Sequence, residues 1–561
     1  MTGVGAERGG TQWNLGSAWE AIADTVGDAP ALIHAEEVRS WSDFEDRSAR
    51  LASVFTDSGI GPDSKVAHLL YNGPEYIEAT FASFKCRSVP VNVNYRYTES
   101  ELRYLLDNSD AEAVVVSSEL AGRLDAVRGD LPGLRLVVQV GDGELIGGAV
   151  RYSDAIAAAD PAPRIERSAD DLWVLYTGGT TGMPKGVMWP HRSLWGINTP
   201  SFKGVGEPQP TTMDELVDTV RRVVTEGRTV RQLPAAPLMH GTSAISSWGV
   251  LSTGGSIVTL TSHSLDALEL LDAVDHRRVT NLVIVGDAFA KPILAALDAE
   301  PTRWDLSSLR MVISSGVMWS QPVKDALLAH VDVVLADLVG SSEAVGFANS
   351  VAKRGRSAAT ARFRLGENAT VLTDDGVAVE PGSGEVGMLA VGGPIPIGYY
   401  KDPDKSAATF RTVGGVTWSI PGDHATVEAD GTIRLMGRGS VCINTAGEKV
   451  FPEEVEETLK LHPAVLDANV VGVPDDKWGQ AVTALVGMVD GAEVADAELV
   501  AHCKVTLAGY KCPKHIIVVD RIHRGPNGKA DYRWAAAVAA DALATVALSD
   551  EALSDETAAG T

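Results

Sequence analysis

Short apolar runs alternate with longer amphipathic stretches through the first third of the chain. The runs "KVAHLL" (65–70), "AVVVSS" (113–118) and "LRLVVQV" (134–140) have the length and residue types of buried strands. The stretches "WSDFEDRSARLASVF" (41–55) and "TESELRYLLDN" (98–108) repeat apolar residues at helical spacing. This alternation predicts an α/β fold in which helices cover layered, mostly parallel sheets.

The same rhythm continues to about residue 345 and then changes. The later apolar runs are "GSIVTLT" (255–261), "NLVIVG" (281–286), "LRMVISSG" (309–316) and "VDVVLADLVG" (331–340). Short strands separated by glycine-rich turns follow, which predicts a small β subdomain over about 366–437. A polar, helix-capable insertion at 189–231 interrupts the pattern, and we expect a lid or a surface excursion there.

The last part of the chain is a second mixed α/β segment. The small residues of "GRGS" predict a hinge near 437–440, which divides an N-terminal domain, 1–437, from a smaller mobile α+β domain, 438–561. A helix is predicted in "EKVFPEEVEETLKLHP" (448–463). The alanine-rich, acidic tail from about 535 is expected to be helical and then frayed.

Composition narrows the function classes. The chain has 561 residues, of which 45% are hydrophobic, enough for more than one core. A net charge of −26 disfavours nucleic acid and anionic membranes as partners. No apolar run reaches the roughly 18 residues of a membrane helix, and the N-terminus lacks a signal-peptide pattern, so we expect a cytoplasmic protein. Four scattered cysteines argue against a disulfide framework or a zinc site.

The stretch "TGGTTGMPKG" (177–186) carries the clearest chemical signal. Its glycines let the backbone approach an anion and aim several N–H groups at it, while Lys185 adds a mobile positive charge. It is no Walker A loop, because Lys185 lies between Pro184 and Gly186. A mobile surface linker is the alternative, but linkers favour serine and acidic residues over a threonine run. We therefore predict a polyphosphate-binding loop of another type.

Four further segments contain candidate residues. In "DLVGSSEAVG", Glu343 follows an apolar strand, where a carboxylate can hold Mg²⁺. In "WSIPGDHATVEADG", Asp423 follows a glycine turn and could accept both ribose hydroxyls. Arg438 in "GRGS" suits phosphate or ribose, and Lys529 stands on the turn "RGPNGKADYR". Taken singly, these are a solvated turn acid, a loop aspartate, a surface ion-pair arginine and an exposed lysine.

Their order along the chain changes that interpretation. It resembles the adenylate-forming superfamily, which includes acyl-CoA synthetases, luciferases and peptide-synthetase adenylation domains, and the resemblance covers nearly the whole chain. Within the superfamily, "PAAPLMHGT", "GDAFAKP" and "SSGVMWS" look like actinobacterial CoA ligases that act on steroid side-chain or long-chain carboxylates. The resemblance implies ATP, Mg²⁺ and coenzyme A as cofactor or co-substrates.

The resemblance also implies roles at matching positions. The residues that would cradle the ATP phosphates are Thr177, Gly178, Gly179, Thr180, Thr181, Gly182 and Lys185. Those that would border the nucleotide elsewhere are Gly316, Val317 and Asp337 at adenine, Asp423 at ribose, and Arg438. Those that would serve the reaction are Glu343 and Ser342 at Mg²⁺ and phosphate, and Lys529 in adenylate formation. Those around the acyl group and CoA are His240 and Trp248 at the acyl pocket and its gate, Gly447 at the CoA tunnel and Ser440 at the hinge.

Three positions depart from the superfamily pattern. Val339 stands where an aromatic residue usually precedes the motif glycine, Ser342 replaces the motif threonine, and Ser440 replaces the usual charged hinge residue. Stacking of adenine on an aromatic ring is therefore not expected at Val339. A hinge mechanism that needs a charge is not expected at Ser440.

The predicted reaction has two steps. A substrate carboxylate attacks the α-phosphorus of ATP, pyrophosphate leaves, and the thiol of CoA then takes the acyl group. Positioning and charge stabilisation should carry the catalysis, as in other phosphoryl transfers. Small and aromatic residues mixed in "MHGTSAISSWGV" (239–250) favour a bulky apolar acid. Loading of a carrier protein, a catalytically silent nucleotide sensor and a homodimer stay open as alternatives.

Overall fold

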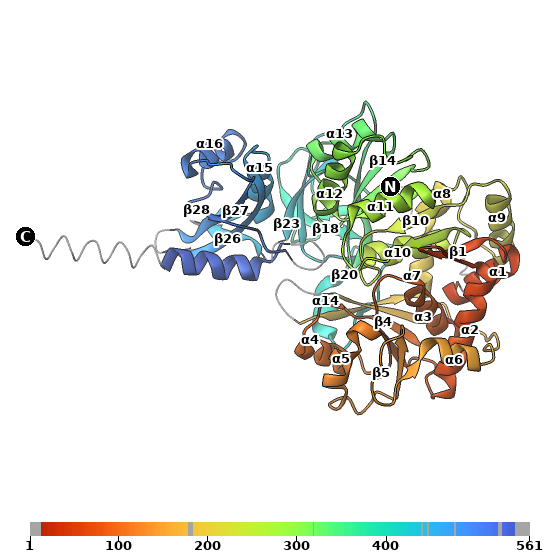
Figure 1. Ribbon diagram of the computed structural model, residues 1–561. Helices are drawn as coiled ribbons and strands as arrows, with labels where there is room; N and C mark the ends of the chain where they lie inside the picture. Colours follow the sequence, from red (N-terminus) through yellow and green to blue (C-terminus); the bar gives the residue numbers. More distant parts are fainter. Residues whose placement is uncertain are drawn as a thin grey trace, which may run out of the picture.

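The computed structural model describes residues 13–177, 183–317, 319–438, 441–445, 448–475, 478–524 and 530–544. Their strands form sheets of eight, fifteen and five strands. Figure 1 shows a large body in which helices and strands are layered, with a smaller body of C-terminal elements at the left. The predicted α/β fold class is confirmed.

The eight-stranded sheet is built mostly from the first 190 residues, with one short strand from later in the chain. Its order is β19 (Gly398–Tyr399), β9 (Lys185–Pro190), β8 (Leu172–Thr177), β4 (Val89–Asn92), β3 (Lys65–Leu69), β5 (Ala111–Ser117), β6 (Leu136–Val140) and β7 (Val150–Arg151). The strands from β8 to β7 are parallel, whereas β9 is antiparallel to β8 and β19 is antiparallel to β9. The helices of this part are α1 (Leu15–Val26), α2 (Trp41–Asp57), α3 (Pro74–Lys85), α4 (Glu99–Asn108), α5 (Ser118–Arg128) and α6 (Tyr152–Ala158).

The fifteen-stranded sheet is parallel on one side and antiparallel on the other. Its parallel part is β1 (Pro30–His34), β11 (Ser256–Thr259), β10 (Arg231–Pro234), β12 (Asn281–Ile284), β13 (Met311–Ser315) and β14 (Val334–Ser341), with β2 (Glu37–Ser40) antiparallel at the edge. Its antiparallel part is β15 (Ala344–Ala352), β16 (Arg362–Leu365), β23 (Thr432–Arg438), β22 (Asp423–Val427), β18 (Val386–Val391), β21 (Val416–Ser419) and β20 (Phe410–Val413), and β17 (Ala369–Leu372) pairs with β18. The predicted change of pattern after about residue 345 is therefore observed.

The remaining helices of the large body lie between residues 191 and 409. They are α7 (His191–Gly196), α8 (Thr199–Gly204), α9 (Met213–Thr225), α10 (Gly241–Leu251), α11 (Ala267–His276), α12 (Gly286–Ala299), α13 (Gln321–His330) and α14 (Pro403–Thr409). In the predicted insertion, α9 buries Leu216 and Val220 beside α1. This helix packs on the large body through one face, and its description as a lid or a surface excursion stays a prediction.

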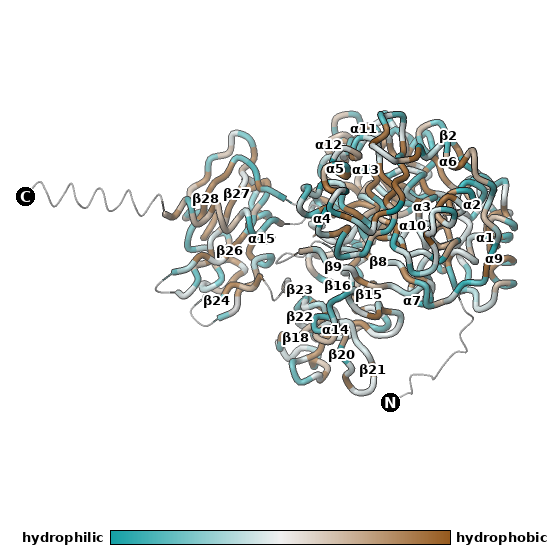
Figure 2. The backbone as a smooth tube through the Cα atoms, turned by 90° about the horizontal axis from the view of Figure 1, so that it is seen from below, coloured by the Kyte–Doolittle hydropathy of each residue, from teal (hydrophilic) through white to brown (hydrophobic). Residues whose placement is uncertain are grey.

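The smaller body has its own sheet and core. Its strands are β24 (Ile443–Thr445), β25 (Glu448–Val450), β26 (Val465–Asp475), β27 (Gly479–Met488) and β28 (His515–Val519), with helices α15 (Pro452–Lys460) and α16 (Asp496–Thr506). A last helix spans 532–544, as expected for the start of the tail. Figure 2 shows largely apolar colouring along β27 and β28, and β27 is buried over most of its length.

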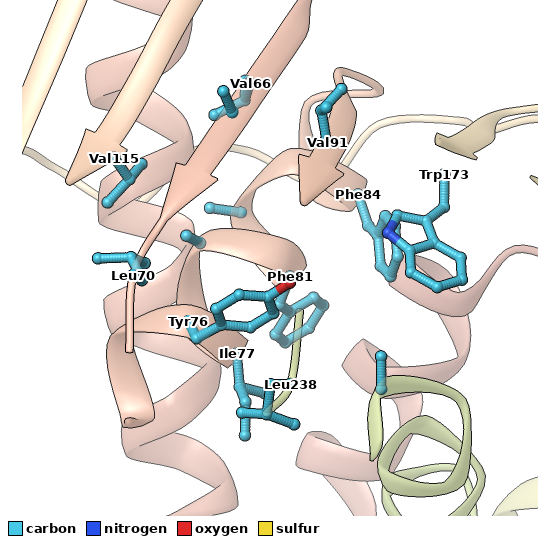
Figure 3. Close-up of a cluster of buried hydrophobic side chains, with 14 of the residues drawn as sticks. Val66, Leu70, Tyr76, Ile77, Phe81, Phe84, Val91, Val115, Trp173 and Leu238 are labelled. Carbon is cyan, nitrogen blue, oxygen red and sulfur yellow. The ribbon is translucent and has the colours of Figure 1, made fainter. Parts of the chain in front are cut away.

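The largest core joins the eight-stranded sheet to α3 and to the segment before α10. Figure 3 shows Phe81 and Phe84 of α3 beside strand residues such as Val66 and Trp173, and these side chains are at most 2% exposed. Fully burying one such side chain contributes about 1.5–3 kcal/mol. The core therefore holds in place the strand ends at which the candidate residues lie. Across the described residues, no helix has the length and apolar character needed to cross a bilayer.

Candidate active site

The β8–β9 hairpin positions Lys185. Thr177 and Lys185 face each other across the two strands, at the end of the hairpin where residues 178–184 connect them. Gly186 lies opposite Tyr176, and a Cβ atom at Gly186 would come within 2.6 Å of the tyrosine ring, so a side chain there would collide. Of the predicted phosphate loop, the residues that lie outside the described part of the chain are Gly178, Gly179, Thr180, Thr181 and Gly182.

Lys185 and Glu343 belong to one group of four side chains. We call this group the phosphate-side cluster, and its members are Lys185, Asp402, Tyr399 and Glu343. The Nζ atom of Lys185 lies 2.5 Å from Oδ2 of Asp402 and 5.8 Å from the centre of the Tyr399 ring. The hydroxyl of Tyr399 donates a hydrogen bond of 2.9 Å to Oε1 of Glu343. The structure thus brings together the lysine and the carboxylate that were predicted from distant segments.

The charged groups of this cluster differ in exposure. The side chains of Lys185 and Asp402 are 39% and 30% exposed, and a hydrogen bond from Lys185 lowers the pKa of Asp402 below its usual value. A lysine that is this exposed can leave the carboxylate for an incoming phosphate. Glu343 is nearly buried, and its backbone is held by the hydroxyl of Ser419, which donates to its carbonyl oxygen at 2.8 Å.

Glu343 fits the role of a magnesium ligand. Its Oε1 accepts the tyrosine hydroxyl, and no described residue donates a hydrogen bond to its second carboxylate oxygen. The described residues contain no group of three or more potential metal ligands. Mg²⁺ often binds through one or two carboxylates together with substrate phosphates, so the single carboxylate of Glu343 is a suitable donor set for it.

The predicted adenine side lies at the carboxyl end of β13 and the adjoining middle of β14. Gly316, with a φ of +92°, and Val317 follow β13, and Asp337 pairs with Ser314 in the parallel register. The Nζ atom of Lys324 in α13 lies 2.6 Å from Oδ2 of Asp337, with both side chains almost fully buried. Burial raises the pKa of Asp337 and the Lys324 ammonium opposes that rise. The role of these residues toward adenine stays a prediction.

The ribose candidates lie next to each other in the antiparallel part of the large sheet. Asp423 begins β22 directly after Gly422, whose φ is +100°, and it is paired in register with Arg438 of β23. Their backbones are therefore neighbours although 15 positions separate them in the sequence. Val339, which replaces the usual aromatic residue, packs against the core of this β region. Ribose binding by Asp423 and Arg438 stays a prediction.

Asn92 connects the end of β8, which precedes the predicted phosphate loop, to the predicted acyl gate. Its Oδ1 accepts a hydrogen bond from the Tyr176 N–H at 2.6 Å, and its Nδ2 donates to the Tyr176 carbonyl at 2.9 Å and to the Met239 carbonyl at 2.7 Å. His240 follows directly as the residue before α10. This buried asparagine therefore holds the end of β8 and the His240 turn at a fixed separation.

Trp248 lies deep in the core of the large body. It is 3% exposed, and its ring stands at 81° to that of Trp173, with the ring centres 4.2 Å apart. The ring of Phe84 is 6.1 Å away. Contact of Trp248 or His240 with an acyl group stays a prediction. The remaining predicted residues that lie outside the described part of the chain are Ser440, Gly447 and Lys529.

Sequence reasoning missed Tyr399, Asp402, Lys324 and Asn92. Three of them carry no motif that singles them out, since a lone lysine on an amphipathic helix and a Tyr-Tyr-Lys-Asp stretch are common patterns. Asn92 had a usable signal, because a polar amide inside the apolar run "VPVNVN" needs buried hydrogen-bond partners. The others are recognised only from their contacts.

Comparison with known proteins gives the family. A family model described as AMP-binding enzyme matches residues 19–400, and one described as AMP-binding enzyme C-terminal domain matches residues 454–529. The chain belongs to the AMP-binding enzyme family, since the first model spans more than half of it. The predicted class, an adenylate-forming acyl-CoA synthetase, is confirmed.

Relatives of similar length are CoA ligases. A 3-oxocholest-4-en-26-oate–CoA ligase of Rhodococcus rhodochrous is 40% identical over 537 residues, which cover 93% of this chain and 95% of the relative. A medium/long-chain-fatty-acid–CoA/3-oxocholest-4-en-26-oate–CoA ligase of Mycobacterium tuberculosis is 40% identical over 529 residues, with the same coverage. Among solved structures, the anthranilate CoA ligase AuaEII in complex with anthranoyl-AMP has a TM-score of 0.80 at 22% identity, covering 94% of this chain and 98% of that chain.

Proposed function

We propose that this enzyme activates a bulky apolar carboxylic acid, a steroid side-chain acid or a long-chain fatty acid, and transfers it to CoA. The phosphate-side cluster carries the activation half of this proposal, because it combines an exposed cation with a nearly buried carboxylate, and Lys185 ends the glycine-rich stretch in the sequence. The names of the relatives support the choice of acid. The small and aromatic residues of α10 support it independently.

The chain's own residues perform three tasks in the first step. Lys185 exchanges Asp402 for a phosphate oxygen of ATP and offsets charge that develops as pyrophosphate leaves. Asp423 and Arg438 hold the ribose, and Gly316, Val317 and Asp337 border the base. Glu343 would hold Mg²⁺, which when bound neutralises phosphate charge. The acid's carboxylate is then placed in line with the α-phosphorus, so that positioning supplies much of the rate.

For the second step, we propose that the domain 438–561 turns about the hinge at 437–440. Gly437 has a φ of +112°, and a Cβ atom there would collide with the carboxylate of Glu453 in α15. A glycine is therefore required at the junction in this arrangement. In this proposal Lys529 serves adenylate formation in one orientation, and the passage at Gly447 admits the CoA thiol in the other.

The test combines an acid panel with two assays. Pyrophosphate release is measured with ATP, Mg²⁺ and acids from acetate to long-chain and steroid acids, and acyl-CoA formation is measured in parallel. We expect the highest kcat/KM for a bulky apolar acid and stalled acyl-adenylate when CoA is omitted. A preference for acetate would contradict the proposed acid, and transfer to a carrier protein but not to CoA would contradict the proposed acceptor.

Single variants test the assigned residues. Lys529→Ala should lower adenylate formation by about 10²–10³-fold, as for loss of one preorganised charge-stabilising donor, and leave thioester formation from supplied acyl-adenylate largely intact. Asp423→Ala should raise the KM for ATP without unfolding the protein. We also propose a cytoplasmic location. The oligomeric state is a separate question, and light scattering of the purified protein decides between a monomer and a homodimer.

A further inference from the structure

Two neighbouring tyrosines of the β19 segment point in opposite directions. Tyr399 is 5% exposed and its hydroxyl donates to Oε1 of Glu343 at 2.9 Å. Tyr400 donates to Oδ2 of Asp110 at 2.7 Å, at the surface of the molecule. Successive side chains of an extended strand face opposite sides, so the two hydroxyls have separate environments although the residues are adjacent. The pair offers a matched site and control.

The backbone of Tyr399 is held in place relative to β9, the strand that begins with Lys185. In β19, Tyr399 pairs with Val187 and Gly398 pairs with Met188, two and three residues beyond Lys185. The Tyr400 N–H also donates to the Gly186 carbonyl at 2.7 Å. The backbone of Tyr399 is therefore tied by hydrogen bonds to the strand that begins with Lys185.

A second set of hydrogen bonds fixes the other side of this segment. The Tyr399 N–H donates to Oγ of Ser406 in α14 at 2.8 Å, and that hydroxyl donates to the Asp402 carbonyl at 2.7 Å. Asp402 in turn is the N-cap residue that precedes α14, and it contacts Lys185. Hydrogen bonds on both sides fix the backbone of Tyr399, and its burial restricts the ring, so its hydroxyl is a preset donor for Glu343.

The bond to Tyr399 decides how the Glu343 carboxylate is oriented. With Oε1 occupied by the hydroxyl, the second oxygen is the one that can face a cation beside the phosphates. Partners that hydrogen-bond to a metal-ligating side chain orient it, and their loss typically costs 10–100-fold in metal affinity or activity. A tyrosine with this geometry acts through the glutamate and needs no contact with the reacting atoms.

We propose that Tyr399 is the positioning residue for Glu343 and sets the affinity of the site for the divalent cation that accompanies ATP. The proposal rests on the proposed function in one respect, the role of Glu343 as the cation ligand. It adds a residue outside the motifs from which the class was predicted.

The direct test measures metal binding in the full-length protein. Mn²⁺ affinity is measured by electron paramagnetic resonance with saturating α,β-methylene-ATP, a nucleotide that cannot be cleaved at the α-phosphate. Tyr399→Phe removes only the hydroxyl and should weaken Mn²⁺ binding about tenfold or more. Tyr400→Phe removes the neighbouring hydroxyl and should leave Mn²⁺ affinity unchanged. Unchanged affinity in Tyr399→Phe, or equal loss in both variants, would overturn the proposal.

A variant cycle separates positioning from general damage. Glu343→Gln should weaken Mn²⁺ binding by itself, and adding Tyr399→Phe to it should cause little further loss, because the tyrosine acts through the glutamate. Additive losses would show that Tyr399 acts elsewhere. This cycle also decides the matter if either single variant loses some stability, since a general loss of folding would add in both backgrounds.

Kinetics provide a second readout and separate this inference from the proposed function. In Tyr399→Phe, higher Mg²⁺ should restore adenylation, while thioester formation from supplied acyl-adenylate stays at the wild-type rate. Suppose that Tyr399→Phe weakens Mn²⁺ binding and Tyr400→Phe does not, but the wild type forms no acyl-CoA. The proposed function then fails and the positioning role stands. If the wild type forms acyl-CoA and Tyr399→Phe has unchanged Mn²⁺ and Mg²⁺ dependence, only the positioning role fails.

Discussion

Two lysine–aspartate pairs in this protein have nearly the same geometry and very different surroundings. Lys185 and Asp402 are 2.5 Å apart, and their side chains are 39% and 30% exposed. Lys324 and Asp337 are 2.6 Å apart, and their side chains are 2% and 6% exposed. Exposed ion pairs contribute about 0.2–1 kcal/mol, whereas removing one partner of a buried pair costs about 3–5 kcal/mol. Burial therefore decides what each pair does.

The pKa shifts of the two aspartates are opposite, and this difference also follows from burial. The hydrogen bond from Lys185 lowers the pKa of Asp402, whereas burial raises the pKa of Asp337 against the opposing Lys324 charge. The exposed lysine can exchange its partner for phosphate at low cost. The buried lysine cannot leave without stranding a carboxylate, so it ties α13 to the middle of β14.

Breaking the buried pair should have the largest effect. Lys324→Met leaves Asp337 without its cation and should lower the free energy of unfolding by about 3–5 kcal/mol, measured by urea denaturation. Lys324→Met combined with Asp337→Leu removes both charges and should recover most of that loss. If the single variant is as stable as the wild type, the contrast drawn between the two pairs is wrong.

Breaking the exposed pair at its lysine should affect chemistry and spare stability. Lys185→Met should slow adenylation by about 10²–10³-fold, or about 2.7–4 kcal/mol in the barrier. The free energy of unfolding should change by less than about 1 kcal/mol. Lys401→Met is a matched control, because Lys401 is 44% exposed and lies 2.8 Å from Asp110 outside the cluster. A similar loss of activity in both variants would remove Lys185 from the site.

Burial of His191 should also make the free energy of unfolding depend on pH. Burial lowers the pKa of His191 to about 3, and its Nδ1 accepts a hydrogen bond from the Leu15 N–H at 3.0 Å. Since the unfolded pKa is about 6.5, the unfolded chain binds the proton more readily, and stability is lost as pH falls from about 6.5 toward 3. The slope is about 1.4 kcal/mol per pH unit for this group. His191→Gln should reduce the measured acid slope by that amount, and an unchanged slope would contradict the assignment.

The smallest effect is expected from Asp402→Asn. This change removes the competitor for Lys185, so the KM for ATP should fall, by at most about fivefold, which corresponds to the roughly 1 kcal/mol ceiling of an exposed pair. Asp110→Asn is the matched surface control and should leave KM unchanged. A higher KM in Asp402→Asn would mean that the aspartate orients the lysine instead of competing with phosphate.

The strands and the motif residues were predictable for a common reason. Apolar runs report burial locally, so β3, β5, β6, β13 and β14 could be located from their own residues. Lys185 and Glu343 lie in short segments whose composition carries chemical information. The side chains that complete the site carry none of their own, because Asp402 meets Lys185 across 217 positions and Lys324 meets Asp337 from a neighbouring helix. Tertiary packing alone selects these partners.

The position of the two-residue strand β19 in the sequence determines when this site can form during synthesis. It lies at the edge of the eight-stranded sheet, next to β9, and thereby covers the outer side of the strand that begins with Lys185. During synthesis at about 5–20 residues per second, Asp402 follows Lys185 by roughly 10–40 s. Until then β9 has an uncovered edge, which is the feature of a sheet most prone to pair with other chains. The arrival of β19 therefore closes that edge and completes the phosphate-side cluster in a single event.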